Sequence, residues 1–185
     1  HIRYQGEIHL YLMGEALCDP DIVERVRQTR REFEKNIIFI STNGDYLDRE
    51  KAKELIDAGI TWVGVSHYDN ENKKLFEISR EFSQIQITPL GQLRQYFYNR
   101  AGHVDIEAIR KYKQCDWVFE KAYINRFGDL VLCCSDYDFE VNFGNVMESS
   151  FYEIYNSERY NEYREHHYFD KGKKMDLCRK CNRIV

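Results

Sequence analysis

The chain has 185 residues, a formal net charge of −4 and 43% hydrophobic side chains. This composition allows one or two domains with a real core, and no apolar run approaches the ~20 residues of a membrane span. Lys and Arg are interspersed with Asp and Glu, so the sequence offers no basic stripe for nucleic acid and no polybasic patch for a membrane. We expect a soluble, cytoplasmic protein whose partner is a small molecule, a peptide or another protein.

The first half of the chain alternates short apolar runs with amphipathic stretches. The apolar runs predict buried strands over 8–12, 37–40, 60–65 and 84–87. The amphipathic stretches, each introduced by an aspartate, predict helices over 22–35 and 48–58. This rhythm indicates right-handed βαβ units and a parallel sheet, either open or curled toward a barrel.

Polar residues follow these strands at their carboxyl ends. They are Gly14, Glu15, Ser41, Thr42, Asn43 and Ser66. Ligands of parallel α/β sheets bind at this edge, so the position of these residues predicts a binding rim. Turn formation is the alternative, because Ser, Asn and Gly dominate turns without any ligand, and Glu15 could cap the helix that follows it.

Four cysteines in the second half form a split pattern. Cys115 and Cys133 belong to C-x12-G-x4-C, and Cys178 and Cys181 form C-x2-C after a long gap. Four thiolates brought together by folding can hold an iron–sulfur cluster or a zinc ion. Disulfides are the weaker interpretation, because nothing at the start of the sequence resembles a secretory signal.

The segments between these cysteines predict how folding brings them together. A β-hairpin over 123–132, with its turn near Gly128, lies between the first two cysteines, and a helix over 150–166 returns the chain toward the last two. The other two cysteines, Cys18 and Cys134, are expected to be small buried residues. The alternative for Cys134 is that it takes the place of its neighbour Cys133 as a ligand. Three histidines have no partners at metal-ligand spacing and are expected at the surface or at helix ends: His67, His166 and His167.

The strand ends resemble those of a known family, the radical S-adenosylmethionine (SAM) enzymes. Residues 11–17 with 19–22 are similar to the family's G-E region, 40–44 to its T-N-G motif, and 63–69 to its S-x-D stretch, although one extra residue separates Ser66 from Asp69. The second half resembles the SPASM or twitch extension of the same family at 99–102, 115–133, 143–146 and 178–181. The resemblance covers nearly the whole chain.

The resemblance implies a fold and a set of cofactors. The fold is a partial (β/α) parallel barrel without its first strand over 1–105, followed by a small α+β iron–sulfur domain over 106–185. Gly14 and Glu15 would receive the amino group of SAM, and Ser66, Thr42 and Asn43 would bind its carboxylate or ribose. The ligands of an auxiliary 4Fe–4S cluster would be Cys115, Cys133, Cys178 and Cys181. The resemblance further implies an electron donor such as flavodoxin or ferredoxin.

One family motif is not in this sequence. The C-x3-C-x2-C loop that binds the SAM-cleaving cluster has no counterpart, because Cys18 is the sole cysteine before Cys115. We expect the sequence to be part of a longer enzyme that carries this second 4Fe–4S cluster, rather than a truncated relative without radical chemistry. That enzyme would be an oxidoreductase or maturase that uses a 5′-deoxyadenosyl radical to modify a peptide or a small polar metabolite. A non-catalytic iron–sulfur module and a four-cysteine zinc domain are the alternatives.

Overall fold

The computed structural model contains two compact units, His1–Tyr96 and Phe97–Val185, which we call the N-terminal and C-terminal units. This division lies earlier in the chain than the boundary after residue 105 that the sequence suggests. The residues that the structure describes are 4–68, 72–93, 97–106 and 115–182.

The N-terminal unit is built on a four-stranded parallel sheet in the order β1-β2-β3-β4. Its strands are β1 (Ile8–His9), β2 (Ile38–Thr42), β3 (Trp62–His67) and β4 (Ile85–Pro89). Strands that follow one another in sequence are neighbours in the sheet, as right-handed crossover connections produce. The predicted parallel sheet is confirmed, and its curling into a barrel stays a prediction.

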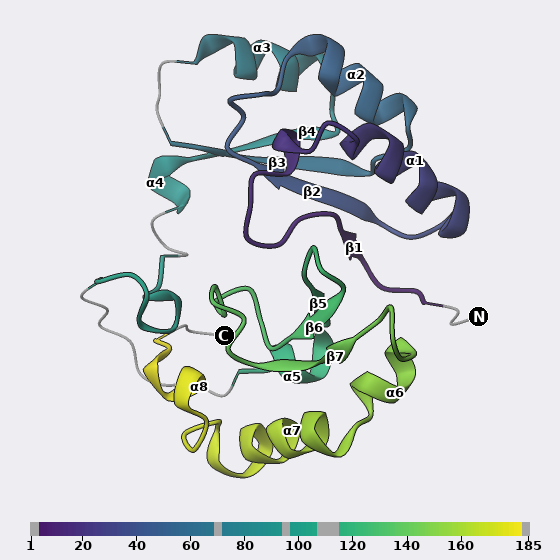
Figure 1. Cartoon of the computed structure of the whole chain (residues 1–185). Helices are drawn as coiled ribbons and strands as arrows, with labels where there is room; N and C mark the ends of the chain where they lie inside the picture. The colour runs from purple at the N-terminus through teal and green to yellow at the C-terminus, as the bar shows by residue number, and fades with distance from the viewer. Residues whose placement is uncertain (1–3, 69–71, 94–96, 107–114, 183–185) are drawn as a thin grey trace. The chain divides into compact units, whose positions relative to one another are not determined.

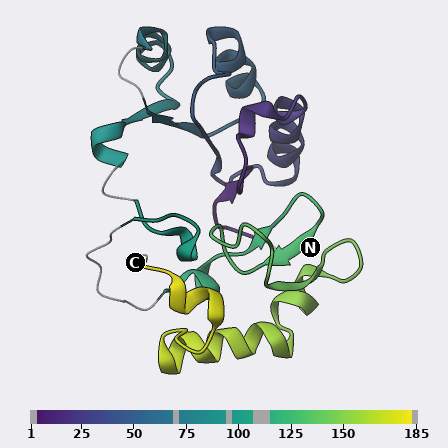
Figure 2. The same ribbon diagram turned by 60° about the vertical axis from the view of Figure 1, so that its left-hand side comes forward.

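Helices α1 (Ile22–Glu32), α2 (Arg49–Asp57) and α3 (Lys73–Glu81) lie along one face of this sheet (Figures 1 and 2). The core between helices and sheet is aliphatic, with Val26, Leu55, Ile40 and Val63 fully buried. A three-residue 3-10 helix, η1 (Ala16–Cys18), follows β1, and the short α4 (Leu90–Leu93) follows β4.

Several elements of the N-terminal unit differ from the sequence prediction. Strands β2, β3 and β4 each end two residues later than predicted, so Ser41, Thr42 and Ser66 lie within the last two residues of their strands rather than after them. The first strand covers two residues rather than 8–12, and α1 ends at Glu32 because Phe33 leaves the helical region at φ −128°. Helix α3 was not predicted, although Leu75 and Ile78 are the buried residues of its core-facing side. Their spacing of three residues is too short a pattern to identify a helix without its tertiary neighbours.

The C-terminal unit contains an antiparallel sheet of β5 (Tyr123–Ile124), β6 (Asp129–Val131) and β7 (Asn142–Asn145). The predicted hairpin is confirmed, since β5 pairs with β6 and Tyr123 lies opposite Val131. Gly128 lies in the connecting turn with φ +87°, a conformation that favours glycine.

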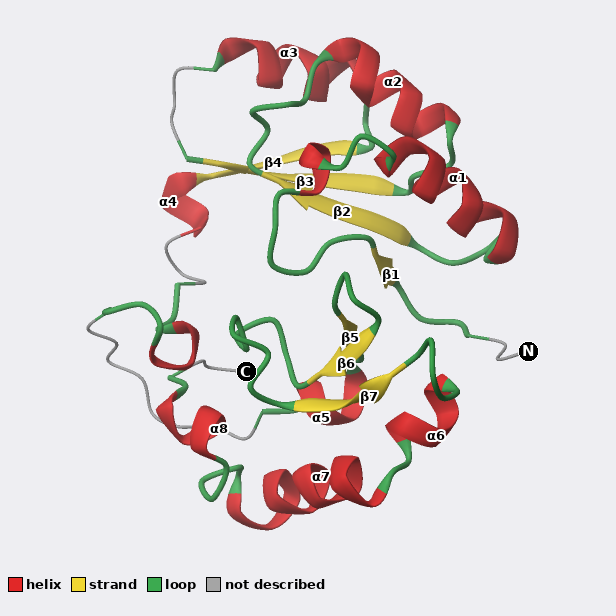
Figure 3. Ribbon diagram, viewed as in Figure 1, coloured by secondary structure: helices red, strands yellow, loops and turns green. Residues whose placement is uncertain are grey.

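Short helices complete this unit, as Figure 3 shows by colour. They are η3 (Arg100–Gly102), α5 (Trp117–Glu120), α6 (Phe151–Tyr155), α7 (Glu158–Asp170) and α8 (Asp176–Lys180). The single helix predicted over 150–166 is two helices, because Ser157 caps a new one by accepting the N–H of Tyr160 at 3.2 Å. Tyr160 is fully buried and its ring centroid lies 4.4 Å from that of Phe143. In the part of the chain that the structure describes, no helix has the length and apolar character needed to cross a membrane.

Candidate functional site

The Glu15 carboxylate connects the segment that follows β1 to the residue that follows β2 by hydrogen bonds. One carboxylate oxygen, Oε1, accepts the N–H of Leu17 at 3.0 Å and so caps η1. The other, Oε2, accepts the N–H of Asn43, directly after β2, at 2.8 Å. The capping role considered from the sequence is therefore present. A carboxylate has about four acceptor positions, so these two hydrogen bonds leave capacity for an ammonium group.

The Thr42–Asn43 turn is stabilised by its own side chains. Thr42 is 3% exposed, and its hydroxyl oxygen accepts the N–H of Gly44 at 3.0 Å. Asn43 Oδ1 accepts the N–H of Asp45 at 3.0 Å, and Asn43 Nδ2 donates to the Asp45 carboxylate at 2.9 Å. These contacts explain both residues as turn formers, and their contact with SAM stays a prediction.

Gly14 lies in open space. A Cβ atom built on it would meet nothing within 4 Å, and its φ lies outside the left-handed range that favours glycine. Gly64 differs, because a Cβ there would lie 3.0 Å from the Phe39 ring. The fold therefore explains Gly64, whereas at Gly14 a ligand that approaches the backbone closely would explain the absence of a side chain.

The sheet face opposite the helices is polar and uncharged near the carboxyl ends of its strands. Side chains alternate between the two faces of a strand, so this face carries Ser41, Gly64, Ser66, Gln86 and Thr88. The register pairs Ser41 with Gly64, Gly64 with Gln86, and Ser66 with Thr88. Ser66 and Ser41 of the predicted rim thus lie on one surface, whereas Thr42 belongs to the helix-covered face.

An aromatic cluster of His9, Tyr11, Phe39 and Trp62 lies where the end of β1 meets the starts of β2 and β3. Phe39 stacks on Trp62 with ring centroids 3.8 Å apart, and Tyr11 meets the Phe39 ring edge-on at 5.3 Å. His9 lies edge-on to Phe39 at 4.9 Å. The face opposite the helices therefore changes from aromatic to hydroxyl-bearing toward the strand ends.

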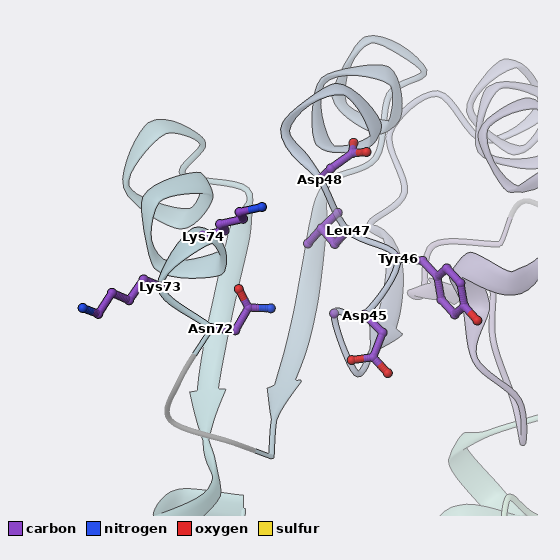
Figure 4. Close-up of a pocket in the computed structure, with 8 residues that line it drawn as sticks. Asp45, Tyr46, Leu47, Asp48, Asn72, Lys73 and Lys74 are labelled. Carbon is purple, nitrogen blue, oxygen red and sulfur yellow. The ribbon is translucent and has the colours of Figure 1, made fainter.

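A hollow of about 770 Å³ lies between the loop after β2 and the start of α3 (Figure 4). It is lined by Gly44, Asp45, Tyr46, Leu47, Asp48, Asn72, Lys73 and Lys74. Its side chains carry both charges and leave it open to solvent, and it contains none of the predicted SAM contacts. We assign it no role.

The four predicted cluster ligands come from three segments of the C-terminal unit. Cys133 follows β6, Cys178 lies within α8, Cys181 caps its C-terminal end, and Cys115 precedes α5. The first three pack against the core of the unit. All four thiols lie close enough for their charges to interact, and none of the chain's six cysteines forms a disulfide.

The surroundings of these thiols disfavour bare thiolates. Burial raises the pKa of Cys133 to about 12; the Ser135 N–H opposes the shift, and the charges of neighbouring thiolates add to it. Burial and the same neighbours also raise the pKa of Cys178. Bound iron or zinc would supply the positive charge that keeps such thiols deprotonated, so the donor set fits a thiolate-ligated group.

The described residues contain no group of three or more His, Cys, Asp or Glu side chains arranged to hold a metal ion. A cubane cluster takes a wider arrangement than a single ion, because each thiolate binds a different iron. The assignment of the four cysteines as ligands stays a prediction.

Tyr98, Arg100 and Ser135 surround the Cys133 turn, and sequence reasoning did not identify Tyr98 or Ser135. The Tyr98 hydroxyl lies 2.9 Å from Ser135 Oγ, and Arg100 Nη1 donates to that hydroxyl at 3.2 Å. The sequence pointed to this region only through the family motif at 99–102, which includes Arg100. That motif does not predict that this segment contacts the turn at Ser135.

Several other sequence predictions need correction. Cys18 is exposed and Cys134 is partly exposed, whereas both were expected to be buried. His67 and His167 are each 2% exposed rather than at the surface, because His67 ends a central strand and His167 faces the core side of α7. Asp69 of the predicted S-x-D stretch lies outside the described residues.

Comparison with protein families gives two matches. Residues 1–85 match the model of the radical SAM superfamily, and residues 115–182 match the SPASM iron–sulfur cluster-binding domain. Each model thus matches one of the two units.

Similarity to individual proteins extends over almost the whole chain. A curated relative from Niallia circulans, named S-adenosyl-L-methionine-dependent 2-deoxy-scyllo-inosamine dehydrogenase, is 22% identical over 188 residues, covering 99% of this chain and 75% of its own length. The crystal structure of BtrN in complex with AdoMet and 2-DOIA has a TM-score of 0.87 at 22% identity, covering 98% of this chain and 74% of that one. An open conformation of BtrN has a TM-score of 0.75 at 19% identity, covering 98% and 73%. At this identity the structural likeness establishes a shared fold.

Proposed function

Because the chain belongs to the radical SAM superfamily and carries a SPASM iron–sulfur domain, we propose that it forms most of an oxidoreductase that oxidises a hydroxylated carbon of a small polar metabolite. The observation that carries the substrate class is the uncharged, hydroxyl-bearing end of the sheet face opposite the helices. The relative named as an inosamine dehydrogenase, which aligns with 99% of this chain, supports the reaction class.

The N-terminal unit would position SAM at its strand ends. The Glu15 carboxylate would attract the ammonium group of SAM while its two backbone hydrogen bonds keep it fixed between Leu17 and Asn43. The open space at Gly14 would let the ligand approach the main chain. Ser66 would donate its hydroxyl to the carboxylate of SAM, and Asn43 would present its amide at the edge of the ribose.

The substrate would lie against the hydroxyl-bearing part of the same face. Ser41 and Thr88 each provide one donor and two acceptor positions, and Gln86 provides both an amide donor and a carbonyl acceptor. Ser66, whose donor would be used by SAM, would offer the substrate acceptor positions alone. This surface suits hydroxyl groups better than carboxylates or phosphates, because its described strand residues Ser41, Ser66, Gln86 and Thr88 are uncharged. A peptide substrate is the alternative, and its extended backbone would make fewer hydroxyl contacts here.

The C-terminal unit would hold an auxiliary 4Fe–4S cluster through Cys115, Cys133, Cys178 and Cys181. When bound, SAM and the two clusters would supply a hydrogen-atom acceptor and a one-electron acceptor, which together with release of the hydroxyl proton to solvent account for oxidation of an alcohol to a carbonyl. The protein's own residues provide binding, orientation and exclusion of water. Thiols without disulfides favour a reducing compartment, so we place the enzyme in the cytoplasm with flavodoxin or ferredoxin as electron donor.

The test uses the complete protein, purified without oxygen. Iron, sulfide and zinc are measured first, and the protein is then incubated with SAM, a reductant and a panel of cyclic polyols, amino-polyols and peptides. The proposal expects 5′-deoxyadenosine to form together with a carbonyl product from a polyol, and deuterium on the oxidised carbon to appear in the 5′-deoxyadenosine.

Two results would overturn this assignment. One zinc and no sulfide, after attempted reconstitution, would make the C-terminal unit a structural zinc domain. A full set of clusters with no SAM cleavage would instead favour the non-catalytic iron–sulfur module. Turnover of peptides alone would keep the enzyme class and replace the substrate.

A further inference from the structure

The Cys133 thiol receives a hydrogen bond from the protein main chain. The N–H of Ser135 points to Cys133 Sγ at 3.4 Å, and Ser135 is only 2% exposed. Hydrogen bonds to ligating sulfurs are one of the main determinants of the reduction potential of an iron–sulfur cluster, because they stabilise the added negative charge of the reduced form. The position of Ser135 therefore matters beyond the packing of this turn.

The Ser135 side chain is held by Tyr98. Their hydroxyl oxygens lie 2.9 Å apart, and Tyr98 is 7% exposed. Asp136 holds the same turn from the other end, since its carboxylate accepts the N–H groups of Glu140 at 2.8 Å and Val141 at 3.0 Å. A turn fixed on both sides keeps the Ser135 amide aimed at the sulfur.

Arg100 places a positive charge on this assembly. Its Nη1 donates to the Tyr98 hydroxyl at 3.2 Å, and its guanidinium carbon lies 4.7 Å from the centroid of the Tyr98 ring. Both Arg100 and Ala101 have positive φ, 50° and 58°, which non-glycine residues rarely adopt. The backbone therefore adopts an unfavourable conformation at Arg100 and Ala101, where the Arg100 guanidinium lies over the Tyr98 ring.

We propose that Tyr98, Arg100 and Ser135 act as positioning residues that raise the reduction potential of the auxiliary cluster. This inference rests on the proposed function, in which Cys133 is a ligand of that cluster. Tyr98 fixes Ser135, Ser135 donates its amide to the Cys133 sulfur, and Arg100 contributes a half-buried positive charge. A higher reduction potential of the cluster favours transfer of an electron to it from the substrate during oxidation.

The experiment measures the midpoint potential of the auxiliary cluster by electron paramagnetic resonance in anaerobic redox titrations of the complete protein. Tyr98→Phe removes the hydroxyl and keeps the ring. Ser135→Ala removes the hydroxyl that Tyr98 contacts and keeps the backbone N–H that donates to Cys133. Arg100→Gln removes the positive charge. Each variant is expected to lower the potential while retaining iron and sulfide. Arg100→Lys, which keeps the charge, is expected to restore part of the shift.

Matched controls are available in the same unit. Tyr152→Phe changes a tyrosine that is 70% exposed, and Arg126→Gln changes an exposed arginine; both should leave the potential unchanged. Unaltered potentials in Tyr98→Phe, Ser135→Ala and Arg100→Gln would overturn the inference, and so would loss of the cluster in all three, which would make their role structural. If the parent protein contains no auxiliary cluster, the proposed function fails first, so the two failures are distinguishable.

Discussion

Asn99 and Asn182 exchange a reciprocal pair of hydrogen bonds across the C-terminal unit. The N–H of Asn99 donates to Asn182 Oδ1 at 2.7 Å, and the N–H of Asn182 donates to Asn99 Oδ1 at 3.0 Å. Asn99 Nδ2 also donates to the carbonyl of Lys180 at 2.7 Å. Because Cys181 lies between Lys180 and Asn182, Asn99 fixes the chain on both sides of a predicted ligand, next to the Tyr98 that contacts the Cys133 turn.

Replacement of Asn99 by Ala should destabilise the C-terminal unit and speed the loss of its cluster. The change removes two side-chain hydrogen bonds, which we expect to lower the free energy of unfolding by about 1–3 kcal/mol. Chemical denaturation and the rate of iron release to a chelator measure the two effects. Asn161→Ala is the matched control, because it also removes two side-chain hydrogen bonds, one donated to the Asn156 carbonyl and one accepted from Arg164, and both are exposed. Equal iron release from the two variants would contradict the role given to Asn99.

The cysteine assignments predict a sharp difference between variants. Cys115→Ser and Cys178→Ala should each lose the auxiliary cluster, which amounts to about four irons and four sulfides per chain. Cys18→Ala should keep full content, because Cys18 is exposed and belongs to the other unit. Iron and sulfide analysis with visible spectra decides the matter, and the same metal content in all three variants would refute the ligand set.

Two glycine-to-alanine changes separate ligand approach from packing. Gly14→Ala adds a methyl group in open space and should change stability by less than about 0.5 kcal/mol, yet weaken SAM binding. Gly64→Ala pushes a methyl group toward Phe39 and should cost about 1–3 kcal/mol of stability. Calorimetric titration with SAM and thermal unfolding measure both properties. Unchanged SAM affinity in Gly14→Ala would remove Gly14 from the proposed site.

Glu15→Gln tests the carboxylate with little change in shape. Gln keeps one acceptor oxygen for a backbone N–H but loses the negative charge, so SAM affinity should fall while auxiliary iron content stays the same. Asp21→Asn is the control, since this acidic residue is exposed and lies at the start of α1, outside the proposed SAM site. SAM binding that is equally weak in both variants would point to a general charge effect.

The pH dependence of stability should carry the signature of His167. Burial lowers the pKa of His167 below its usual 6.5, although its hydrogen bond to the Tyr163 carbonyl at 2.7 Å partly offsets the shift. The folded state therefore favours the neutral ring. Above about pH 6.5 the ring is neutral in both the folded and the unfolded state, and the buried neutral ring contributes fully to the free energy of unfolding. Below that pH the unfolded state binds a proton more readily than the folded state, so the free energy of unfolding falls.

Urea unfolding between about pH 7.5 and 5.5 measures this effect. His167→Asn keeps a donor near the Nδ1 position and cannot titrate, so its stability should be lower overall but should change less with pH. A slope equal to that of the parent protein would assign the titration to another group.

The architecture of the N-terminal unit could largely be predicted from local pattern. Continuous apolar runs such as Ile38–Ile40 predicted strands buried beneath helices, and aspartates predicted helix starts such as Asp48, which caps α2 by accepting the Lys51 N–H at 2.7 Å. These are short-range effects of hydrophobic burial and capping, and they act within a few residues. Where the pattern is weaker, as at α3 and at the Ser157 break, tertiary packing decided the elements.

The spacing of four cysteines predicted a thiolate-bound cluster or zinc, and the resemblance to the radical SAM family predicted SAM and iron–sulfur clusters as the cofactor classes. Only the tertiary structure decided what surrounds them. Tyr98 contacts Ser135, Asn99 contacts Asn182 and Glu15 reaches Asn43 over long stretches of chain. Such contacts depend on the relative placement of packed elements, which burial of the whole core determines and no local pattern encodes.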